Sequence, residues 1–458
     1  MKLDVARTDV DGAADRGVWL RDPIAVLAEG AERGIVVAGG VIKELVGRAG
    51  PRTQVAEIFD AGRHVVLPGL VNAHHHFYQT LTRAHPQALD KDLFPWLQAL
   101  YPIWGRALDR QSFRLGVRVA LAELLMSGCT TTTDHLFVFP ADMPDAVDIE
   151  IQEARALGMR IALTRGAINL GFEDGGIADP RLMQDHDTVM ADCERVIALY
   201  HDPRPGSFST VALAPCAPFN VTKRLMIDSA ELAKRHGCRL HTHLGESADE
   251  NRYCEAHFGC RPIEYLEQTG WLGEQTWLAH GIHFRDDEIA RLGRHRVGVC
   301  HCPTSNMVLS SGTCPTRDLE AAGVAVGLGV DGSASNDSSN LMETVRHATM
   351  LGKLHYGATQ ISHLDALRWG TRGSAECLGR PDIGTIAVGR QADLALFGLE
   401  DLRFSGSGDP VAALVLCGAH RADRVMIGGR WRVVDGEPVD VDVAELRILH
   451  AAAAKAFV

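Results

Sequence analysis

The sequence lacks the segments that carry a chain into or across a membrane. It has no run of about 18 uncharged apolar residues, the minimum for a membrane-spanning helix. Met1–Arg16 is polar and carries both charge signs, without the apolar stretch of a secretory signal peptide. The eleven cysteines are scattered, odd in number and without a Cys-x-x-Cys. These absences argue against membrane, secreted and disulfide-scaffold proteins, and we expect reduced thiols in the cytoplasm.

The sequence also has fewer basic residues than acidic ones. Lys and Arg number 46 against 58 Asp and Glu, which gives a formal net charge of −12. A chain this acidic is a poor binder of phosphate backbones. We therefore expect a small-molecule substrate and no nucleic-acid or membrane partner, and a nucleobase would be bound as the free base.

The middle of the sequence alternates between strand and helix patterns. The expected strands are Val65–Val71, Thr130–Asp134, Met159–Thr164, Thr210–Ala214, Arg239–His243, Thr276–Ala279, Val297–Cys300 and Val324–Val330. Helical patterns between them cover Phe113–Ser127, Asp145–Leu157, Val189–Tyr200, Thr222–His236, Arg285–Leu292 and Leu341–Leu351. This alternation predicts a (β/α)₈ barrel, in which polar groups at the C-terminal strand ends form the active site.

Both ends of the chain have the pattern of short strands joined by turns. The expected strands are Val26–Leu27, Ile35–Val37, Val41–Ile42, Asp393–Phe397, Ala412–Leu416 and Arg424–Ile427. The fold class is therefore predicted as α/β, a (β/α)₈ TIM-like barrel with a small β-sandwich built from both chain ends. Residues 1–66 and 383–458, the latter with a terminal helix, would form the sandwich, and residues 67–382 the catalytic barrel.

Histidines stand at the ends of the first and fifth predicted strands. Residues two apart on a strand point to the same side, so His74 and His76 can share an ion while His75 faces away. His241 and His243 share a face in the same way and offer a third imidazole, a ligand that suits zinc, iron and nickel. Taken alone, either motif could be a loop cluster or a hydrogen-bonded core histidine.

Three more polar groups fall at strand ends. Glu246 follows the fifth strand, His280 closes the sixth, and Asp331 follows the eighth, where an unpaired carboxylate would be costly. Helix capping and backbone hydrogen bonding are the alternatives. Because these histidines and carboxylates all stand at strand ends, the sequence favours one catalytic metal site with an open position for water. Asp331 and His280 can take the proton of that water, and Glu246 can protonate a ring nitrogen and then the leaving group.

Together these motifs resemble the amidohydrolase superfamily, in its mononuclear deaminase and chlorohydrolase branch. The matching segments are Pro68–His76, His243–Glu246, Ala279–Gly281, Val330–Asn336 and Gly384–Leu394. The resemblance runs from about Gly34 to Val439. It implies one divalent ion, zinc or sometimes iron, on His74, His76, His243 and Asp331, with Glu246 and His280 moving protons. The end of the fourth strand, Leu213–Cys216, has no lysine that could bridge two metals.

Within that branch the sequence is most similar to deaminases of 8-oxoguanine. The similarity lies in His74–Arg83, Leu93–Leu97, Thr164–Gly171 and Ala214–Phe219. It implies hydrolytic deamination of 8-oxoguanine to urate and ammonia, by a homo-oligomer (a dimer or larger). A hydroxylated s-triazine and guanine are alternative substrates. A metal-free binding or scaffold protein is a remote alternative, which the intact set of ligands disfavours.

Three residues are candidates for holding a flat, nitrogen-rich ring. Gln79 can both donate and accept at a lactam edge, and Trp96 can stack on the ring. Cys216 stands where many relatives carry histidine, and its S–H could donate to the C8 oxygen of an oxopurine. The alternatives are a solvent-facing amide, an interface tryptophan and a buried packing thiol. Cys300 and Cys302 are interpreted as packing residues.

The role assigned to Cys216 predicts an unequal effect of its removal. Cys216→Ala should lower kcat/KM more for 8-oxoguanine than for guanine, because only the former offers an oxygen at C8. Steady-state ammonia release with both bases measures the two ratios. Equal losses for both bases would contradict the assignment.

Overall fold

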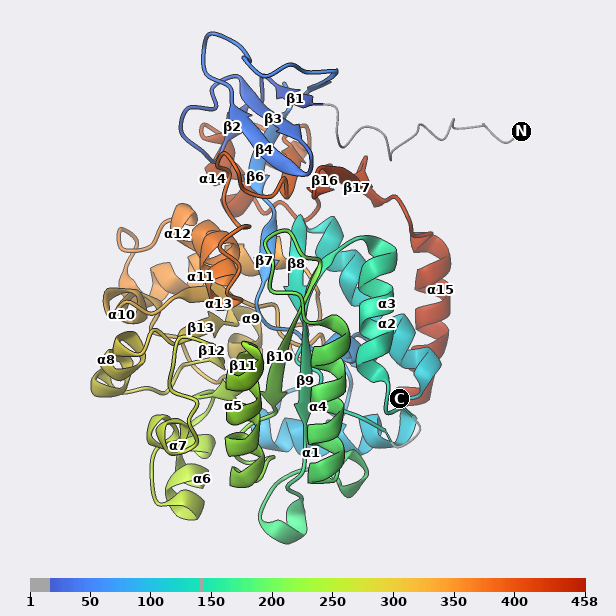
Figure 1. The fold of residues 1–458 in the computed structure, drawn as a ribbon, viewed down its shortest axis with the longest axis vertical. Helices are drawn as coiled ribbons and strands as arrows, with labels where there is room; N and C mark the ends of the chain where they lie inside the picture. The colour runs from blue at the N-terminus through green and yellow to red at the C-terminus, as the bar shows by residue number, and fades with distance from the viewer. Residues whose placement is uncertain (1–16, 141–142) are drawn as a thin grey trace.

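A closed barrel of eight parallel strands forms the centre of the protein, as predicted (Figure 1). The computed structural model describes residues 17–140 and 143–458, so Met1–Arg16 lies outside the described part. The barrel strands are β7 (Leu70–Asn72), β8 (Cys129–Thr133), β9 (Arg160–Ala167), β10 (Ser209–Pro215), β11 (Arg239–Leu244), β12 (Thr276–His280), β13 (Gly298–His301) and β14 (Val326–Leu328). The Ala73 N–H donates to the Leu328 carbonyl over 2.9 Å and joins the first strand to the last.

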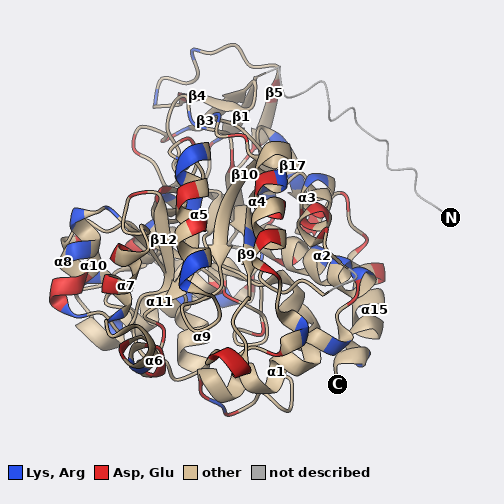
Figure 2. Ribbon diagram, turned by 60° about the horizontal axis from the view of Figure 1, so that its bottom comes forward, with Lys and Arg blue, Asp and Glu red and all other residues tan. Residues whose placement is uncertain are grey.

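Helices cover the outside of the barrel, and all six predicted ones are present. They are α2 (Arg110–Met126), α3 (Ala146–Leu157), α4 (His186–Tyr200), α5 (Lys223–His236), α8 (Asp286–Arg294) and α11 (Leu341–Tyr356). The others are α1 (Leu93–Ala107), α6 (Ala248–Phe258), α7 (Pro262–Gln268), α9 (Pro303–Val308), α10 (Thr316–Ala321), α12 (His363–Arg368), α13 (Ser374–Cys377), α14 (Pro410–Leu416) and α15 (Val443–Ala454). Figure 2 shows charges of both signs interspersed on these helices.

Both chain ends build two small sheets beside the barrel. A six-stranded sheet joins β2 (Ala25–Val26) and β6 (His64–Pro68) to β15 (Leu394–Gly398), β16 (Arg424–Ile427), β17 (Arg430–Val434) and β18 (Glu437–Pro438). The other contains β1 (Val18–Arg21), β3 (Gly34–Ala38), β4 (Val41–Leu45) and β5 (Glu57–Asp60). Buried side chains of both sheets, including Leu20, Ile35 and Leu394, share one core. The expected sandwich from both ends is thus present, while its division at residues 66/67 and 382/383 stays a prediction.

The connection between β6 and β7 orients the barrel. β6 lies in the small sheet, and after Gly69 the chain enters the barrel directly as β7. A Cβ at Gly69 would lie 2.2 Å from the Thr130 side chain, so this close approach requires glycine. The N-terminal ends of the barrel strands therefore face the small sheets, and their C-terminal ends open on the opposite side, where α1 crosses (Figure 1).

The strand predicted over Ala412–Leu416 is wrong, because these residues belong to α14. The Asp409 carboxylate accepts the Ala412 N–H over 2.8 Å and Pro410 occupies the first turn, which are helix-start signals. An apolar run this short does not distinguish a strand from a buried helix. The N-cap residue before it, Asp409, is what identifies the segment as a helix.

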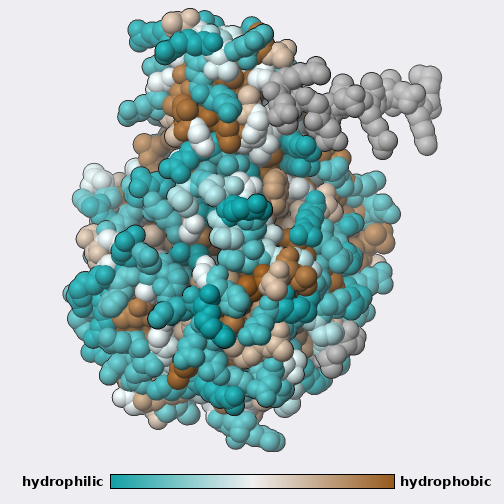
Figure 3. All heavy atoms as spheres, in the orientation of Figure 1, coloured by the Kyte–Doolittle hydropathy of each residue, from teal (hydrophilic) through white to brown (hydrophobic). Residues whose placement is uncertain are grey.

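The described part of the chain contains no helix that is both long and apolar enough to span a bilayer. All eleven cysteines are free, and every one except Cys417 is buried. Hydrophilic residues dominate the face in Figure 3, and hydrophobic ones gather there mainly over the small sheets.

A buried ion pair fastens the barrel to the small sheets and predicts a large effect on stability. Arg160 Nε donates to Asp393 Oδ2 over 2.7 Å, and both side chains are 1% exposed. Asp393→Ala removes the carboxylate and leaves the buried guanidinium with neutral acceptors only, at Gly206, Ser207 and Gln391. The free energy of unfolding should therefore fall by about 3–5 kcal/mol. Urea titration measures this. Glu376→Gln, which breaks an exposed pair with Arg372, is the control and should cost about 0–1 kcal/mol. A loss for Asp393→Ala as small as the control's would contradict the role of this pair.

Candidate metal and catalytic site

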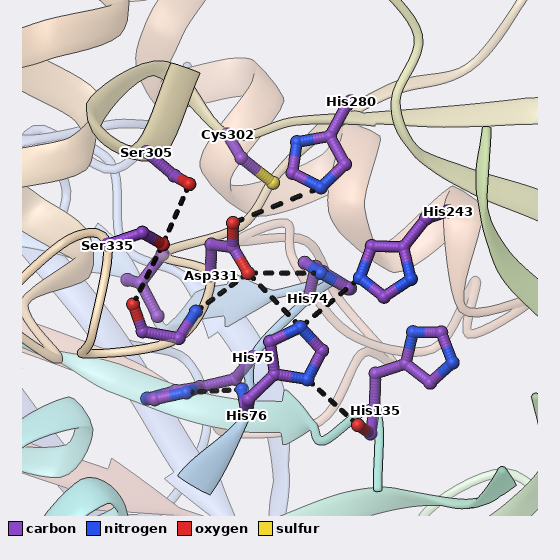
Figure 4. Close-up of polar contacts among 12 residues, drawn as sticks. His74, His75, His76, His135, His243, His280, Cys302, Ser305, Asp331 and Ser335 are labelled. Carbon is purple, nitrogen blue, oxygen red and sulfur yellow. Dashed lines mark hydrogen bonds and ion pairs between the residues drawn. The ribbon is translucent and has the colours of Figure 1, made fainter. Parts of the chain in front are cut away.

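The four predicted metal ligands and His280 lie together at the C-terminal end of the barrel (Figure 4). His74 and His76 follow β7, His243 lies in β11, and Asp331 follows β14. Asp331 Oδ1 is 3.3 Å from Nε2 of both His74 and His76, and Nε2 of His76 is 3.2 Å from Nε2 of His243. All four side chains are buried. The structure thus brings together the four residues for which the sequence predicts a shared ion.

Each of the three imidazoles has its Nδ1 proton committed elsewhere. His76 Nδ1 donates to the His135 carbonyl over 2.8 Å, and His243 Nδ1 donates to the Cys216 carbonyl over 2.7 Å. His74 Nδ1 lies 2.8 Å from His241 Nε2. His241 donates its own Nδ1–H to the Trp277 carbonyl over 2.9 Å, so its Nε2 must accept. All three Nε2 atoms therefore carry bare lone pairs that converge on one point.

This donor set fits one divalent ion. Ligand atoms about 2.0–2.1 Å from a tetrahedral zinc ion lie about 3.3 Å from one another, close to the separations found here. His74 Nε2 is buried without a hydrogen-bond partner. Burial lowers the pKa of His74 and of His243 well below the usual value, which keeps both rings neutral. Burial raises the pKa of Asp331, but the facing His74 and His76 rings outweigh this effect and hold that pKa well below the usual value. Burial lowers the pKa of His76, but the facing Asp331 carboxylate outweighs it and raises that pKa, so binding of a metal there would release a proton.

The backbone turns two of the catalytic residues into the site. His280 has φ of 74° and Asp331 has φ of 66°, a left-handed conformation that non-glycine residues seldom adopt. Such strain is tolerated where the surroundings hold the residue, and it clusters at functional sites. Here it directs Asp331 Oδ2 toward His280 Nε2, at 3.9 Å (Figure 4).

Glu246 and His280, the residues predicted to transfer protons, lie beside each other in the site. Glu246 Oε2 lies 3.6 Å from His280 Nε2, and both side chains are buried. Burial raises the pKa of Glu246 well above its usual value, and the nearby Asp331 carboxylate adds to the effect. His280 Nδ1 donates to Asn306 Oδ1 over 3.0 Å, so its Nε2 is the acceptor that faces the site. Asn306 had no predicted role. It stands three residues after Pro303, beyond the end of the seventh predicted strand, and this position is the only signal that could have indicated one.

A small cavity of about 30 Å³ lies next to these groups. Its wall includes the three predicted substrate-binding residues, Gln79, Trp96 and Cys216, and also Tyr101 and Asn220. Trp96 and Tyr101 come from α1, so the segment after the first strand covers the site. A larger open cavity around Arg239 and Arg296 lies toward the opposite end of the barrel and contains none of the predicted site residues.

Comparison with known proteins supports this geometry. The model of the amidohydrolase family matches residues 65–432. The chain is 55% identical to the 8-oxoguanine deaminase of Pseudomonas aeruginosa over 96% of this chain and 99% of that protein. It is 37% identical to the hydroxydechloroatrazine ethylaminohydrolase of a Pseudomonas species, over 86% of this chain and 83% of that one. The structure of atrazine chlorohydrolase from Arthrobacter aurescens complexed with zinc superimposes with a TM-score of 0.88 at 30% identity, covering 95% of this chain and 100% of that chain.

The hydrogen bond from His74 to His241 predicts a graded loss of metal. His241→Phe keeps a ring stacked on Trp277 but removes the acceptor for His74 Nδ1–H. Loss of such an outer partner should weaken metal affinity about 10- to 100-fold. Competition with a chromogenic chelator measures the dissociation constant. His301→Phe, at another buried strand-end histidine, is the control and should bind metal as the wild type does. An unchanged constant for His241→Phe would contradict the proposed orientation.

Proposed function

The chain belongs to the amidohydrolase family, and on that premise we propose that it deaminates 8-oxoguanine hydrolytically to urate and ammonia. The observation that carries the proposal is the 55% identity to an 8-oxoguanine deaminase, which extends over 96% of this chain. The balance is simple: water adds at C2, the exocyclic amine leaves as ammonia, and a carbonyl remains. Ten buried free thiols and the acidic charge fit a cytoplasmic enzyme that acts on free bases.

We propose His74, His76, His243 and Asp331 as ligands of a single zinc ion, on the basis of the three bare Nε2 atoms and the facing carboxylate oxygen. When bound, the ion supplies a water molecule whose pKa is lowered toward about 7. Asp331 Oδ2 and His280 Nε2, which lie 3.9 Å apart, would orient the attacking water and accept its proton. His280 keeps its acceptor nitrogen inward as long as Asn306 holds Nδ1–H.

Glu246 is the proton carrier of the proposed reaction. Its raised pKa favours the protonated form, which can donate from the carboxyl group to a ring nitrogen next to C2. That proton makes C2 more electrophilic. Glu246 then takes up the proton that His280 and Asp331 accepted from the water, and it passes this proton to the leaving amine. His280 Nε2 lies 3.6 Å from Glu246 Oε2 and 3.9 Å from Asp331 Oδ2, so His280 stands close to both carboxyl groups.

The cavity wall supplies contacts for a planar base. Trp96 Nε1 donates to the Ala334 carbonyl over 3.2 Å, which fixes the indole at the cavity. Gln79 Oε1 accepts the Ala334 N–H at 3.4 Å, which leaves the Nε2 group for a lactam oxygen. We therefore assign Gln79 to the lactam edge and Trp96 to a ring face. Both residues are buried, as positions that exclude water from the ring should be.

A hydroxylated s-triazine is the second candidate substrate, and the 37% identity to a hydroxydechloroatrazine ethylaminohydrolase favours it. Such rings share the features used by the proposed mechanism, a carbon between two nitrogens and an amine leaving group. The homo-oligomer expected from the sequence stays a prediction, which light scattering of the purified protein would check.

The proposed substrate predicts the outcome of an ammonia-release panel. Purines, pterins and hydroxylated triazines are offered to the zinc-loaded protein at matched concentrations. The kcat/KM for 8-oxoguanine should exceed that for guanine and for the triazines, because the chain follows the 8-oxoguanine deaminase over nearly its whole length. A triazine or a pterin as the best substrate would replace the proposal.

The assignment of Glu246 predicts loss of turnover without loss of metal. Glu246→Gln keeps the size of the side chain but cannot carry a proton, so kcat should fall about 10²- to 10⁴-fold. Metal content by elemental analysis should stay at the wild-type level, since Glu246 is not among the proposed ligands. A variant that turns over normally, or one that loses the metal, would contradict the role.

A further inference from the structure

Three polar side chains meet in the cavity wall and are not explained by the metal site. Tyr101 comes from α1, Cys216 ends the β10 segment, and Asn220 lies in the loop before α5. Their exposed fractions are 1%, 3% and 0%. Asn220 Nδ2 donates to Tyr101 Oη over 2.7 Å and lies 3.4 Å from Cys216 Sγ. We call these three residues the polar corner.

Some donors and acceptors of the polar corner are not used by the hydrogen bonds inside it. Both protons of the Asn220 amide nitrogen point to partners, one to the hydroxyl and one to the thiol. The Tyr101 hydroxyl and the Cys216 thiol both accept from Asn220. The hydroxyl also lies within reach of the thiol, and a ligand oxygen would compete with the sulfur for its hydrogen. Asn220 Oδ1 is buried and has no hydrogen-bond partner. The corner therefore offers two donors and one acceptor, and a buried acceptor without a partner destabilises the protein until a ligand supplies a donor.

This pattern matches one edge of an oxidised purine. In 8-oxoguanine the five-membered ring is a cyclic urea, with a carbonyl at C8 between N7–H and N9–H. A carbonyl accepts from the hydroxyl and the thiol, while an adjacent N–H donates to Asn220 Oδ1. Guanine has a C–H at that carbon and one unprotonated ring nitrogen beside it, so the two donors lose their shared acceptor.

We propose that Tyr101 and Asn220, together with Cys216, form the subsite that reads the urea edge of an 8-oxopurine. Asn220 Oδ1 accepts from the ring N–H next to C8, and the Tyr101 hydroxyl and the Cys216 thiol donate to the C8 oxygen. This inference deepens the proposed function and rests on it for the identity of the substrate. It adds Asn220 and Tyr101 as specificity-determining residues, whereas the sequence assigned only Cys216 to the C8 oxygen.

The protonation state of the corner agrees with this arrangement. Burial raises the pKa of Tyr101 well above its usual value, so the hydroxyl keeps its hydrogen throughout the neutral range. Asn220 is held in place by its backbone, whose carbonyl accepts the N–H groups of Asn169 and Leu170, both at 3.1 Å. The side chain is therefore presented by a fixed loop, as selective recognition of one edge requires.

Binding of two products separates recognition from catalysis. Urate carries the urea edge, and xanthine is the same molecule with a C–H at C8. Calorimetry of the zinc-loaded wild type should give tighter binding of urate than of xanthine. Asn220→Leu removes the acceptor at similar volume, and Tyr101→Phe removes only the hydroxyl. Each should weaken urate about 10- to 100-fold while changing xanthine by less than about threefold.

A third variant controls for disturbance of the loop. The Asn169 side chain bonds Thr222 and none of the corner side chains, and its backbone N–H bond to the Asn220 carbonyl is kept in Asn169→Ala. This variant should leave the ratio of the two affinities unchanged. Equal losses of urate and xanthine in both Asn220→Leu and Tyr101→Phe, or no loss in either, would overturn the inference.

The inference and the proposed function can fail separately. If the wild type releases ammonia from 8-oxoguanine but the variants keep the wild-type ratio of affinities, only the inference is overturned. If the wild type does not turn over 8-oxoguanine but selects urate through Asn220 and Tyr101, only the proposed reaction is overturned.

Discussion

Three imidazoles can hold one ion only if each keeps its proton on the nitrogen that faces away from it. That constraint is met here by fixed acceptors behind the rings: the carbonyl oxygens of His135 and Cys216, and Nε2 of His241. Two of these acceptors, the carbonyls of His135 and Cys216, are main-chain groups just beyond barrel strands. The metal site therefore depends on how the strands end, and a shift of the barrel would change which nitrogen each histidine presents.

The rest of the architecture serves to fix those strand ends. The Ala73–Leu328 hydrogen bond closes the barrel beside His74, and the Asp331 N–H donates to the His74 carbonyl over 3.1 Å. Asn72 adds a side-chain bond to the Val330 N–H at 2.9 Å, so the first and last strands are tied together directly beneath the ion-binding groups. The small sheets and α1 then close the two ends. One end carries the buried Arg160–Asp393 pair, and the other carries the substrate cavity.

Much of this was accessible from the sequence, because a parallel barrel converts simple periodicity into position. Strand-end location alone predicted that His74, His243 and Asp331 would meet. Periodicity could not show whether His241 or His243 faces the ion, because both side chains point into the barrel. Only their depth differs: His243 lies at the proposed metal site, and His241 lies behind it as the hydrogen-bond partner of His74. Asn220 and Asn306 lie in a loop and a short helix, where no repeat pattern indicates direction. The error at Ala412–Leu416 has the same origin, since a short apolar run carries no period of its own.

The central claim is that one divalent ion, held by these bare nitrogens and Asp331, makes this chain a deaminase of 8-oxoguanine. It is tested most directly by removing the metal with a chelator and titrating zinc back while ammonia release from 8-oxoguanine is followed. The account predicts an inactive apoprotein whose activity rises linearly and stops at one equivalent of zinc per chain. Full activity without metal, or a break at two equivalents, would contradict it.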